Sequence, residues 1–254
     1  MSTFRKFYRS ILFVILIITG ILLTLIFLRN TMPTRGISSK VGTKWLGLVS
    51  RVFGVRIKTY GHPLSEKTLF VANHISWLDI LVIGSLVPMQ FLSKLEVKKM
   101  PVFGWLATRA GTLYIKRGCT NSASDASSEI TDALNQNHNS LIFAEGTTTD
   151  GHVKKFHSRM MQSAIDAHAM VQPVAIFYPM TNPKTEKPEL NPAALFIGNT
   201  SIGESYDLVT REKIIDVEVH FLKPISSKGQ TRDDISRHAY EEVVTAIKAI
   251  KKRI

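Results

Sequence analysis

Short apolar segments alternate with amphipathic ones along most of the chain after residue 60. The apolar segments predict buried strands at 68–72, 89–93, 111–116, 140–143, 174–178, 194–197 and 217–222. Helical spacing of apolar positions predicts helices at 77–86, 122–137, 156–168 and 233–253, while the proline-rich segment 182–192 is typical of a loop. This alternation predicts an α/β fold, a single domain with a mixed central sheet flanked by helices.

Two of these helices carry a clear apolar stripe. In the closing helix, the side chains expected to point inward are Ile235, Ala239, Val243, Ile247 and Ile250, and its last turn is basic. In the segment 156–168, the stripe is formed by Phe156, Met160, Ala164 and Ile165. We interpret this second stripe as core rather than as the lining of a groove, although methionines suit both.

The N-terminal part of the chain has a different pattern. Residues Ile11 to Leu28 contain no charge, and as a helix they would be about 27 Å long, close to the hydrocarbon thickness of a bilayer. The cations Arg5, Lys6 and Arg9 precede this run, and no small-residue cleavage site follows it. We therefore predict a retained membrane anchor within residues 1–30. Cations on both sides leave its orientation open.

A basic amphipathic helix is predicted at 38–53. Its apolar positions are Val41, Trp45, Leu48, Val49, Val52 and Phe53, with Lys40, Lys44 and Arg51 among them. This pattern suits a membrane surface, and packing against the domain is a nearly equal alternative. We assign 31–60 as an interfacial segment and 61–254 as the main domain. The apolar segment 101–106 is a second candidate for contact with lipid.

The chemistry of the chain centres on the segment Asn73 to Asp79. His74 and Asp79 are five residues apart, so on one continuous helix their side chains would point about 140° apart. They can meet if His74 lies in the turn between the strand 68–72 and the helix 77–86. A carboxylate bonded to one imidazole nitrogen leaves the other free to accept a proton from a hydroxyl. Ser76 is expected to cap the helix, and no companion nucleophile is evident.

A second polar segment follows the strand 140–143. Glu145 and Gly146 stand at the strand end, followed by Thr147 and Thr148. Such a loop can present backbone N–H groups to an anion or to substrate hydroxyls. A simple Thr-Asp-Gly turn is the alternative.

The strand 111–116 ends in two cations, Lys116 and Arg117. Either can contact a phosphate, and the planar guanidinium suits bidentate contact best. A solvated strand end would have the same composition.

Composition narrows the class of protein. The net charge of +12 suits an anionic membrane surface, an acidic carrier protein or a phosphate-rich donor. No nucleic-acid motif accompanies the charge, so we expect no nucleic-acid partner. Zinc-ligand spacing, a Walker loop and a dinucleotide fingerprint are also missing from the sequence, and we expect neither a metal nor a cofactor. The single cysteine excludes an internal disulfide.

Taken together, these segments resemble the 1-acylglycerol-3-phosphate acyltransferase family of membrane glycerolipid acyltransferases. The four family blocks align with residues 73–79, 111–117, 143–148 and 171–175, in the family's order and spacing. The resemblance covers roughly residues 68–178. It implies His74 and Asp79 as catalytic residues, and the following acceptor-binding residues: Asn73, Lys116, Arg117, Glu145, Gly146, Thr147 and Thr148.

Two positions depart from the family pattern. Ala144 stands where the family usually has proline, and Thr148 where it usually has arginine or serine. The segment Glu145 to Gly151 and the following Lys155 to Ser158 also resemble the branch that acylates lyso-ornithine lipids in bacteria. The acceptor implied first is 1-acyl-sn-glycerol-3-phosphate, and lyso-ornithine lipid is the alternative.

The resemblance implies direct acyl transfer from acyl-ACP or acyl-CoA to a lysolipid hydroxyl, with membrane lipids as partners. It also implies a location at the bacterial inner membrane with the domain facing the cytoplasm. Two other functions stay open: a non-catalytic membrane-anchored lipid-binding protein, and a hydrolase in which water replaces the lysolipid.

Overall fold

The structure is a computed structural model that describes residues 2–27, 37–65, 67–116, 122–181 and 188–253. The strands of the central sheet are β1 (Val55–Tyr60), β2 (Thr68–Ala72), β3 (Gln90–Lys94), β4 (Leu113–Ile115), β5 (Ser140–Phe143), β6 (Met170–Phe177), β9 (Ile215–Phe221) and β10 (Ile225–Ser226). A separate hairpin consists of β7 (Pro179–Thr181) and β8 (Pro188–Leu190). The predicted mixed α/β fold is confirmed.

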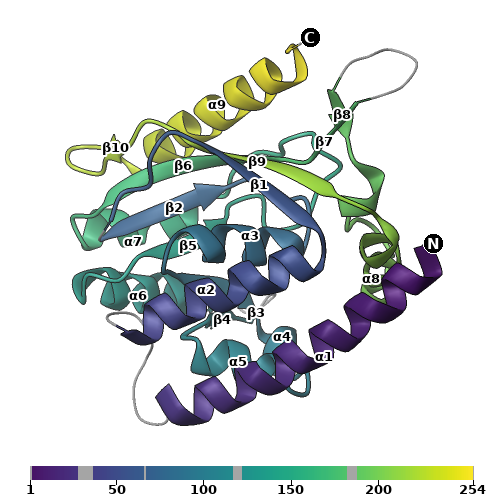
Figure 1. Cartoon of the computed structure of the whole chain (residues 1–254). Coiled ribbons are helices and arrows are strands. Elements are labelled where there is room, and N and C mark those ends of the chain that lie inside the picture. The colour runs from purple at the N-terminus through teal and green to yellow at the C-terminus, as the bar shows by residue number, and fades with distance from the viewer. Residues whose placement is uncertain (1, 28–36, 66, 117–121, 182–187, 254) are drawn as a thin grey trace.

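The described helices are α1 (Ser2–Phe27), α2 (Ile37–Val52), α3 (Leu78–Leu86), α4 (Leu95–Lys98), α5 (Phe103–Arg109), α6 (Ser122–Asn135), α7 (Gln162–Asp166), α8 (Ile202–Arg211) and α9 (Arg232–Lys251), with 3₁₀ turns η1 (Ser158–Met161) and η2 (Pro192–Ala194). In Figure 1, α9 covers the sheet from above, and α2 and α3 cover it from below.

The central sheet has the order β1-β9-β6-β2-β5-β3-β4, with β10 paired to β6. Neighbouring strands are parallel except at β6–β9 and β6–β10. Parallel strands are usually buried on both faces, and all five residues of β2 are buried. The center of the sheet therefore has no solvent-facing side.

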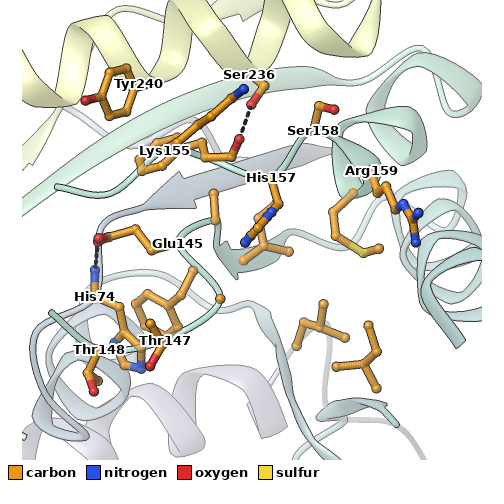
Figure 2. A pocket seen from close by; sticks show the side chains of 18 of the residues that line it. His74, Glu145, Thr147, Thr148, Lys155, His157, Ser158, Arg159, Ser236 and Tyr240 are labelled. Carbon is orange, nitrogen blue, oxygen red and sulfur yellow. Dashed lines mark hydrogen bonds between the residues drawn. The ribbon is translucent and has the colours of Figure 1, made fainter. Parts of the chain in front are cut away.

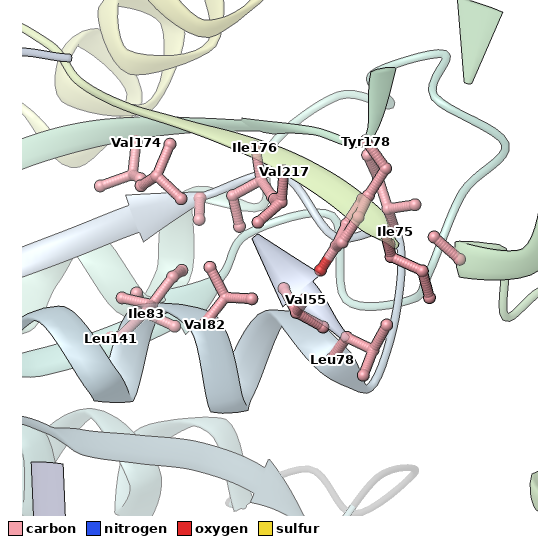
Figure 3. Close-up of a cluster of buried hydrophobic side chains, with 14 of the residues drawn as sticks. Val55, Ile75, Leu78, Val82, Ile83, Leu141, Val174, Ile176, Tyr178 and Val217 are labelled. Carbon is pink, nitrogen blue, oxygen red and sulfur yellow. The ribbon is translucent and has the colours of Figure 1, made fainter. Parts of the chain in front are cut away.

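Alternate side chains of β2 contribute to two separate cores, as the two-residue period of a strand requires. Phe70 packs with helices α2 and α3, whereas Leu69 and Val71 pack with helices α6, α7 and α9. Figure 3 shows the first core, where Val82 and Ile83 of α3 face the sheet. The inward stripe predicted for the closing helix is confirmed, since all five of its residues are buried in α9.

Several predicted elements differ from the structure. The strand predicted at 194–197 is wrong: Pro192 starts the turn η2, and Asn191 caps it by accepting a hydrogen bond from the Ala193 N–H. The helix predicted at 156–168 is also wrong as a single element, because it divides into η1 and the short α7. The loop predicted at 182–192 contains β8, and residues 182–187 lie outside the described ones.

The N-terminal helix α1 is, among the described helices, the one long and apolar enough to cross a membrane. It lies along the domain beside α5 and α8 (Figure 1). The guanidinium of Arg9 donates hydrogen bonds to carbonyl groups of residues 209, 210, 212 and 213 at the end of α8. Trp45 of α2 donates to the Leu16 carbonyl at 2.9 Å. Hydrogen bonds therefore join the apolar helix to the domain.

The predicted interfacial segment 31–60 contributes directly to the domain. Val49 and Phe53, at the end of α2, are buried in the core beside α3. Strand β1, which was not predicted, forms one edge of the sheet through parallel pairing with β9. The division at residue 60 stays a prediction, while the central sheet begins at Val55.

Candidate active site

The two polar segments, which contain His74 and Glu145, lie side by side at the carboxyl ends of central strands of the sheet. Strands β2 and β5 are parallel neighbours, with Ala72 opposite Phe143, so the loops that follow them leave the sheet side by side. The backbone N–H of His74 donates to Oε1 of Glu145 at 2.8 Å, and the N–H of Thr149 donates to the His74 carbonyl at 2.8 Å. These hydrogen bonds therefore join the turn that contains His74 to the loop that contains Glu145 and Thr149.

His74 and Asp79 meet as expected. His74 lies in the turn between β2 and α3, and its Nδ1 is 2.8 Å from Oδ2 of Asp79 in the first turn of α3. The imidazole stacks on the ring of Phe143, with centroids 3.8 Å apart and planes 12° apart. The side chain of His74 is 18% exposed and lines a groove. Because Nδ1 is held by the carboxylate, Nε2 is the nitrogen available to a bound substrate.

Asp79 is fully buried, and both oxygens of its carboxylate accept hydrogen bonds. In addition to His74, Oδ2 accepts from the N–H groups of Ile75 at 2.8 Å and Ser76 at 3.0 Å. The other oxygen, Oδ1, accepts from the hydroxyl of Tyr178 at 2.6 Å. These bonds stabilise the ionised carboxylate without its exposure to water. The capping role predicted for Ser76 is wrong, because the N-cap residue of α3 is Trp77, whose side chain makes no capping bond. Ser76 lies one residue earlier, where its Oγ accepts from the Leu78 N–H at 3.3 Å.

Sequence reasoning missed Tyr178, which was read as the end of an apolar strand. Its ring is fully buried in the core, and its hydroxyl points toward the start of α3 (Figure 3). Burial, followed by the charge of Asp79, raises the pKa of Tyr178 well above its usual value. The phenol therefore stays protonated and acts as a donor. A tyrosine at the end of a strand beside the predicted histidine loop is the signal that could have identified it.

Asn73 takes a different position from the one implied by the resemblance. Its side chain is 1% exposed and does not line the groove. Its amide donates to the Ile176 carbonyl at 2.9 Å and accepts from the Ile176 N–H at 2.8 Å. Asn73 therefore links the end of β2 to β6, beside His74, and contacts backbone rather than the space in which a substrate would bind.

Glu145 is buried, with both carboxylate oxygens in use. Oε1 accepts from His74, and Oε2 accepts from the Lys154 N–H at 2.8 Å. Burial raises the pKa of Glu145, and the N–H groups of Lys154 and His74 oppose that rise. Gly146 next to it has a positive φ of 68°, a conformation that favours glycine. The loop is thus fixed beside the imidazole.

A groove of about 1860 Å³ runs past these residues. Gly146, Thr147 and Thr148 line it next to His74, and Figure 2 shows both threonine side chains close to the imidazole. Its apolar wall includes Leu92, Ile115, Ile142, Phe156 and Met160. Phe156 and Met160 are also part of the second core, so the stripe predicted as core contributes both to the core and to the wall of the groove. The groove is large enough for a molecule with a long apolar chain and a polar head.

The described cations that line the groove are not those predicted from the sequence. Lys116 is exposed at the end of β4 and does not line the groove, and Arg117 lies outside the described residues. The described cations in the lining are Lys94, Lys155, Arg159, Arg232 and Arg237. Sequence reasoning predicted a place in the site for none of these five. The positions of Arg159, Arg232 and Arg237 depend on how η1 and α9 pack, which a local pattern does not reveal.

The described residues include no group of three or more His, Cys, Asp or Glu side chains placed to hold a metal ion. The chemistry that this arrangement supports is proton transfer by an oriented imidazole at the edge of an amphipathic groove.

Comparison with known proteins agrees with this geometry. The acyltransferase family model matches residues 55–177. A lyso-ornithine lipid O-acyltransferase from Pseudomonas aeruginosa is 34% identical over 97% of this chain and 95% of its own length. A 1-acyl-sn-glycerol-3-phosphate acyltransferase from Neisseria gonorrhoeae is 35% identical over 50% of this chain and 52% of its own length.

The fold has a solved counterpart. The crystal structure of the 1-acyl-sn-glycerophosphate acyltransferase PlsC from Thermotoga maritima superposes with a TM-score of 0.72, covering 100% of this chain and 97% of that one, at 19% identity. This likeness shows the fold, including the N-terminal helix. With the relatives above, it shows that the chain belongs to the acyltransferase family that includes lyso-ornithine lipid and 1-acyl-sn-glycerol-3-phosphate acyltransferases.

Proposed function

We propose that this protein transfers a fatty acyl chain from an acyl thioester to the free hydroxyl of a lysolipid. The observation that carries the proposal is the His74–Asp79 pair, in which Nδ1 is held 2.8 Å from the carboxylate while the imidazole lines the groove. No acyl-enzyme is needed, because a thioester is already activated toward an oxygen nucleophile.

The geometry supports a direct mechanism. Neutral His74 donates its Nδ1–H to Asp79, so Nε2 accepts the proton of the lysolipid hydroxyl as that oxygen attacks the thioester carbonyl carbon. The tetrahedral intermediate collapses with cleavage of the carbon–sulfur bond. The imidazolium then returns its proton to the departing thiolate. Asp79 stabilises the imidazolium between these steps, and its four donors keep it from moving.

Lyso-ornithine lipid is our first candidate for the acceptor, because a relative named for that substrate matches nearly the whole chain. Lysophosphatidate is the second candidate, since relatives named for it match about half the chain at similar identity. Within the groove, Gly146, Thr147 and Thr148 are proposed to contact the acceptor. Lys116, which follows β4, and Arg117, which lies outside the described residues, are proposed to attract its anionic group.

We further propose that α1 and α5 hold the domain on a membrane. Apolar side chains are exposed along α1, and Val102, Phe103 and Trp105 are exposed at and before the start of α5. Phe13 of α1 stacks on Phe103 with ring centroids 6.1 Å apart, so the two apolar surfaces are continuous. A bacterial inner membrane with the groove on the cytoplasmic side would give access to acyl-ACP and acyl-CoA.

The test is to offer the purified full-length protein a panel of lysolipids with labelled acyl-ACP and acyl-CoA. Label in a two-chain lipid is the expected result, and the panel also identifies the donor. Label released only as free fatty acid would instead support a hydrolase. Binding of lysolipid without consumption of thioester would support a lipid-binding protein, and either outcome overturns acyl transfer.

A further inference from the structure

One wall of the groove is formed by the first three turns of α9. Asp233, Arg237 and Glu241 line the groove at intervals of four residues, and residues four apart lie on one helix face. Ser236 and Tyr240 line it between them, and Figure 2 shows both on the helix above Glu145. Arg232 and Asp234 of the first turn also line the groove, so this wall presents charges of both signs toward the cavity that contains His74.

The charges of this wall are only partly paired among themselves. Arg237 Nη2 is 2.6 Å from Asp234 Oδ1, and Asp234 also accepts from Thr231. Within the described part of the chain, Asp233 and Glu241 take part in no ion pair or side-chain hydrogen bond. Lys155 extends toward Ser236 from the loop opposite (Figure 2), and it too has no ion pair among the described residues. Asp233, Glu241 and Lys155 therefore face the same space without an ion pair among the described residues, beside Arg237, which is paired with Asp234.

We infer that the α9 wall binds an acceptor head group that carries both a carboxylate and an ammonium. Arg237 and Lys155 bind the carboxylate, for which the guanidinium fork is suited, and Asp233 and Glu241 bind the ammonium. A dianionic phosphate fits this wall less well, because it would lie beside two carboxylates that no described cation neutralises. The inference rests on the proposed function and assigns the amino-acid head group to particular residues.

The plain alternative is that these side chains form a solvated helix face, in which i,i+4 charges support the helix itself. The two explanations differ in their dependence on the substrate. If the face is only solvated, substitutions on it change the stability of the protein and act alike on all acceptors. If it is a head-group site, they change the KM of one acceptor and leave the KM of the others unchanged.

The experiment compares wild type with the double variant D233N/E241Q, using lyso-ornithine lipid and lysophosphatidate in the same neutral detergent micelles. The double variant should raise the KM for lyso-ornithine lipid roughly 10-fold to 100-fold, with little change in kcat, because it loses charge-assisted contacts. The kcat/KM for lysophosphatidate should stay the same or rise. E242Q is the matched control, since Glu242 is on the same helix but does not line the groove.

A change in the substrate provides a second arm that needs no variant. Lyso-ornithine lipid with its side-chain amine acetylated lacks the ammonium, so wild type should use it less well by a similar factor, and D233N/E241Q should not distinguish the two. Equal effects of the double variant on both acceptors, or wild-type indifference to acetylation, would overturn the inference. If wild type acylated neither lysolipid, the proposed function itself would fail.

Discussion

The hydroxyl of Tyr178 donates to Oδ1 of Asp79 over 2.6 Å, and both side chains are fully buried. Tyr178 directly follows β6, whereas Asp79 belongs to the first turn of α3, so the bond joins residues 99 apart in sequence. It holds one carboxylate oxygen while His74 and two backbone N–H groups hold the other. The orientation of the imidazole thus depends on a residue that does not reach the groove.

Tyr178→Phe should lower kcat about tenfold, since a buried hydrogen bond to a charged group is lost. The loss in kcat should be similar for every acceptor and the acceptor KM should not change, because Tyr178 holds Asp79 and does not line the groove. Steady-state kinetics of wild type and variant with two acceptors check this. Tyr206→Phe is the control, because Tyr206 bonds Ser10 away from the groove. A raised KM with an unchanged kcat would contradict a positioning role.

His74→Ala should reduce acyl transfer by roughly 10²-fold to 10⁴-fold while the protein remains folded, because the imidazole supplies general-base catalysis. Asp79→Asn should also be severe, since an amide no longer stabilises the imidazolium. Transfer rates and thermal unfolding of each variant are measured together. His152→Ala removes a similar His–Asp pair, with Nδ1 3.0 Å from Asp150 but on the exposed surface, and should have no effect. A folded His74→Ala variant within a few-fold of wild type would exclude His74 as the base.

Thr148→Arg should shift acceptor preference toward lysophosphatidate. Thr148 lines the groove next to His74, and an arginine there would place a bidentate cation beside the acceptor. Competition between lysophosphatidate and lyso-ornithine lipid in one assay measures the ratio of kcat/KM directly. Thr148→Gln is the control for size without charge. An unchanged ratio would show that this position does not determine acceptor choice.

Removing residues 1–29 should release only part of the protein from membranes. The basic helix α2 and the exposed apolar side chains before and within α5 remain, and they provide a second attachment. Sedimentation with vesicles at low and high salt separates apolar insertion, which resists salt, from charge attraction, which does not. Trp105→Ser should decrease the salt-resistant fraction, whereas Met180→Ser, at an exposed position on β7, should not. Complete release at low salt would disprove a second attachment.

The burial of His220 predicts that the free energy of unfolding depends on pH. His220 is buried on β9, where it stacks on Tyr60 and lies 2.9 Å from Glu218. Burial lowers the pKa of His220 below 6.5, and Glu218 only partly opposes this. The folded state therefore binds fewer protons than the unfolded state. The stability from neutral His220 is present above about pH 6.5 and is lost as pH falls through the lowered pKa. Denaturant unfolding at several pH values should show a smaller loss in His220→Gln than in wild type. An identical loss would contradict this origin.

The features predicted correctly from the sequence are local ones. The strand 68–72, the turn at His74 and the helix that begins near Asp79 follow from contiguous residues, and the structure has all three. The prediction failed at 194–197 because an apolar run there looks like a strand, while the Asn191 cap and Pro192 determine the conformation. The asparagine and the proline are themselves local features, and they outweigh the apolar run in determining the backbone conformation here.

Features that depend on distant partners could not be predicted. The position of β1 in the sheet depends on its pairing with β9, where Arg56 forms an ion pair with Asp216, 160 residues away in the sequence. The bond between Tyr178 and Asp79 is a similar case. For α9, the apolar stripe at Ile235 and Ala239 was evident, but nothing in the sequence showed that the adjacent face lines the groove.

The double attachment of Glu145, to the backbone of His74 and of Lys154, affects how mutational data on this site are interpreted. A Glu145 variant that loses activity would not by itself reveal a substrate contact, since displacement of the histidine loop produces the same loss. The two causes differ in kinetics: a lost contact raises the acceptor KM, whereas a misplaced base lowers kcat for every acceptor. Separate measurement of KM and kcat is therefore needed to decide whether Glu145 contacts the lipid or supports the imidazole of His74.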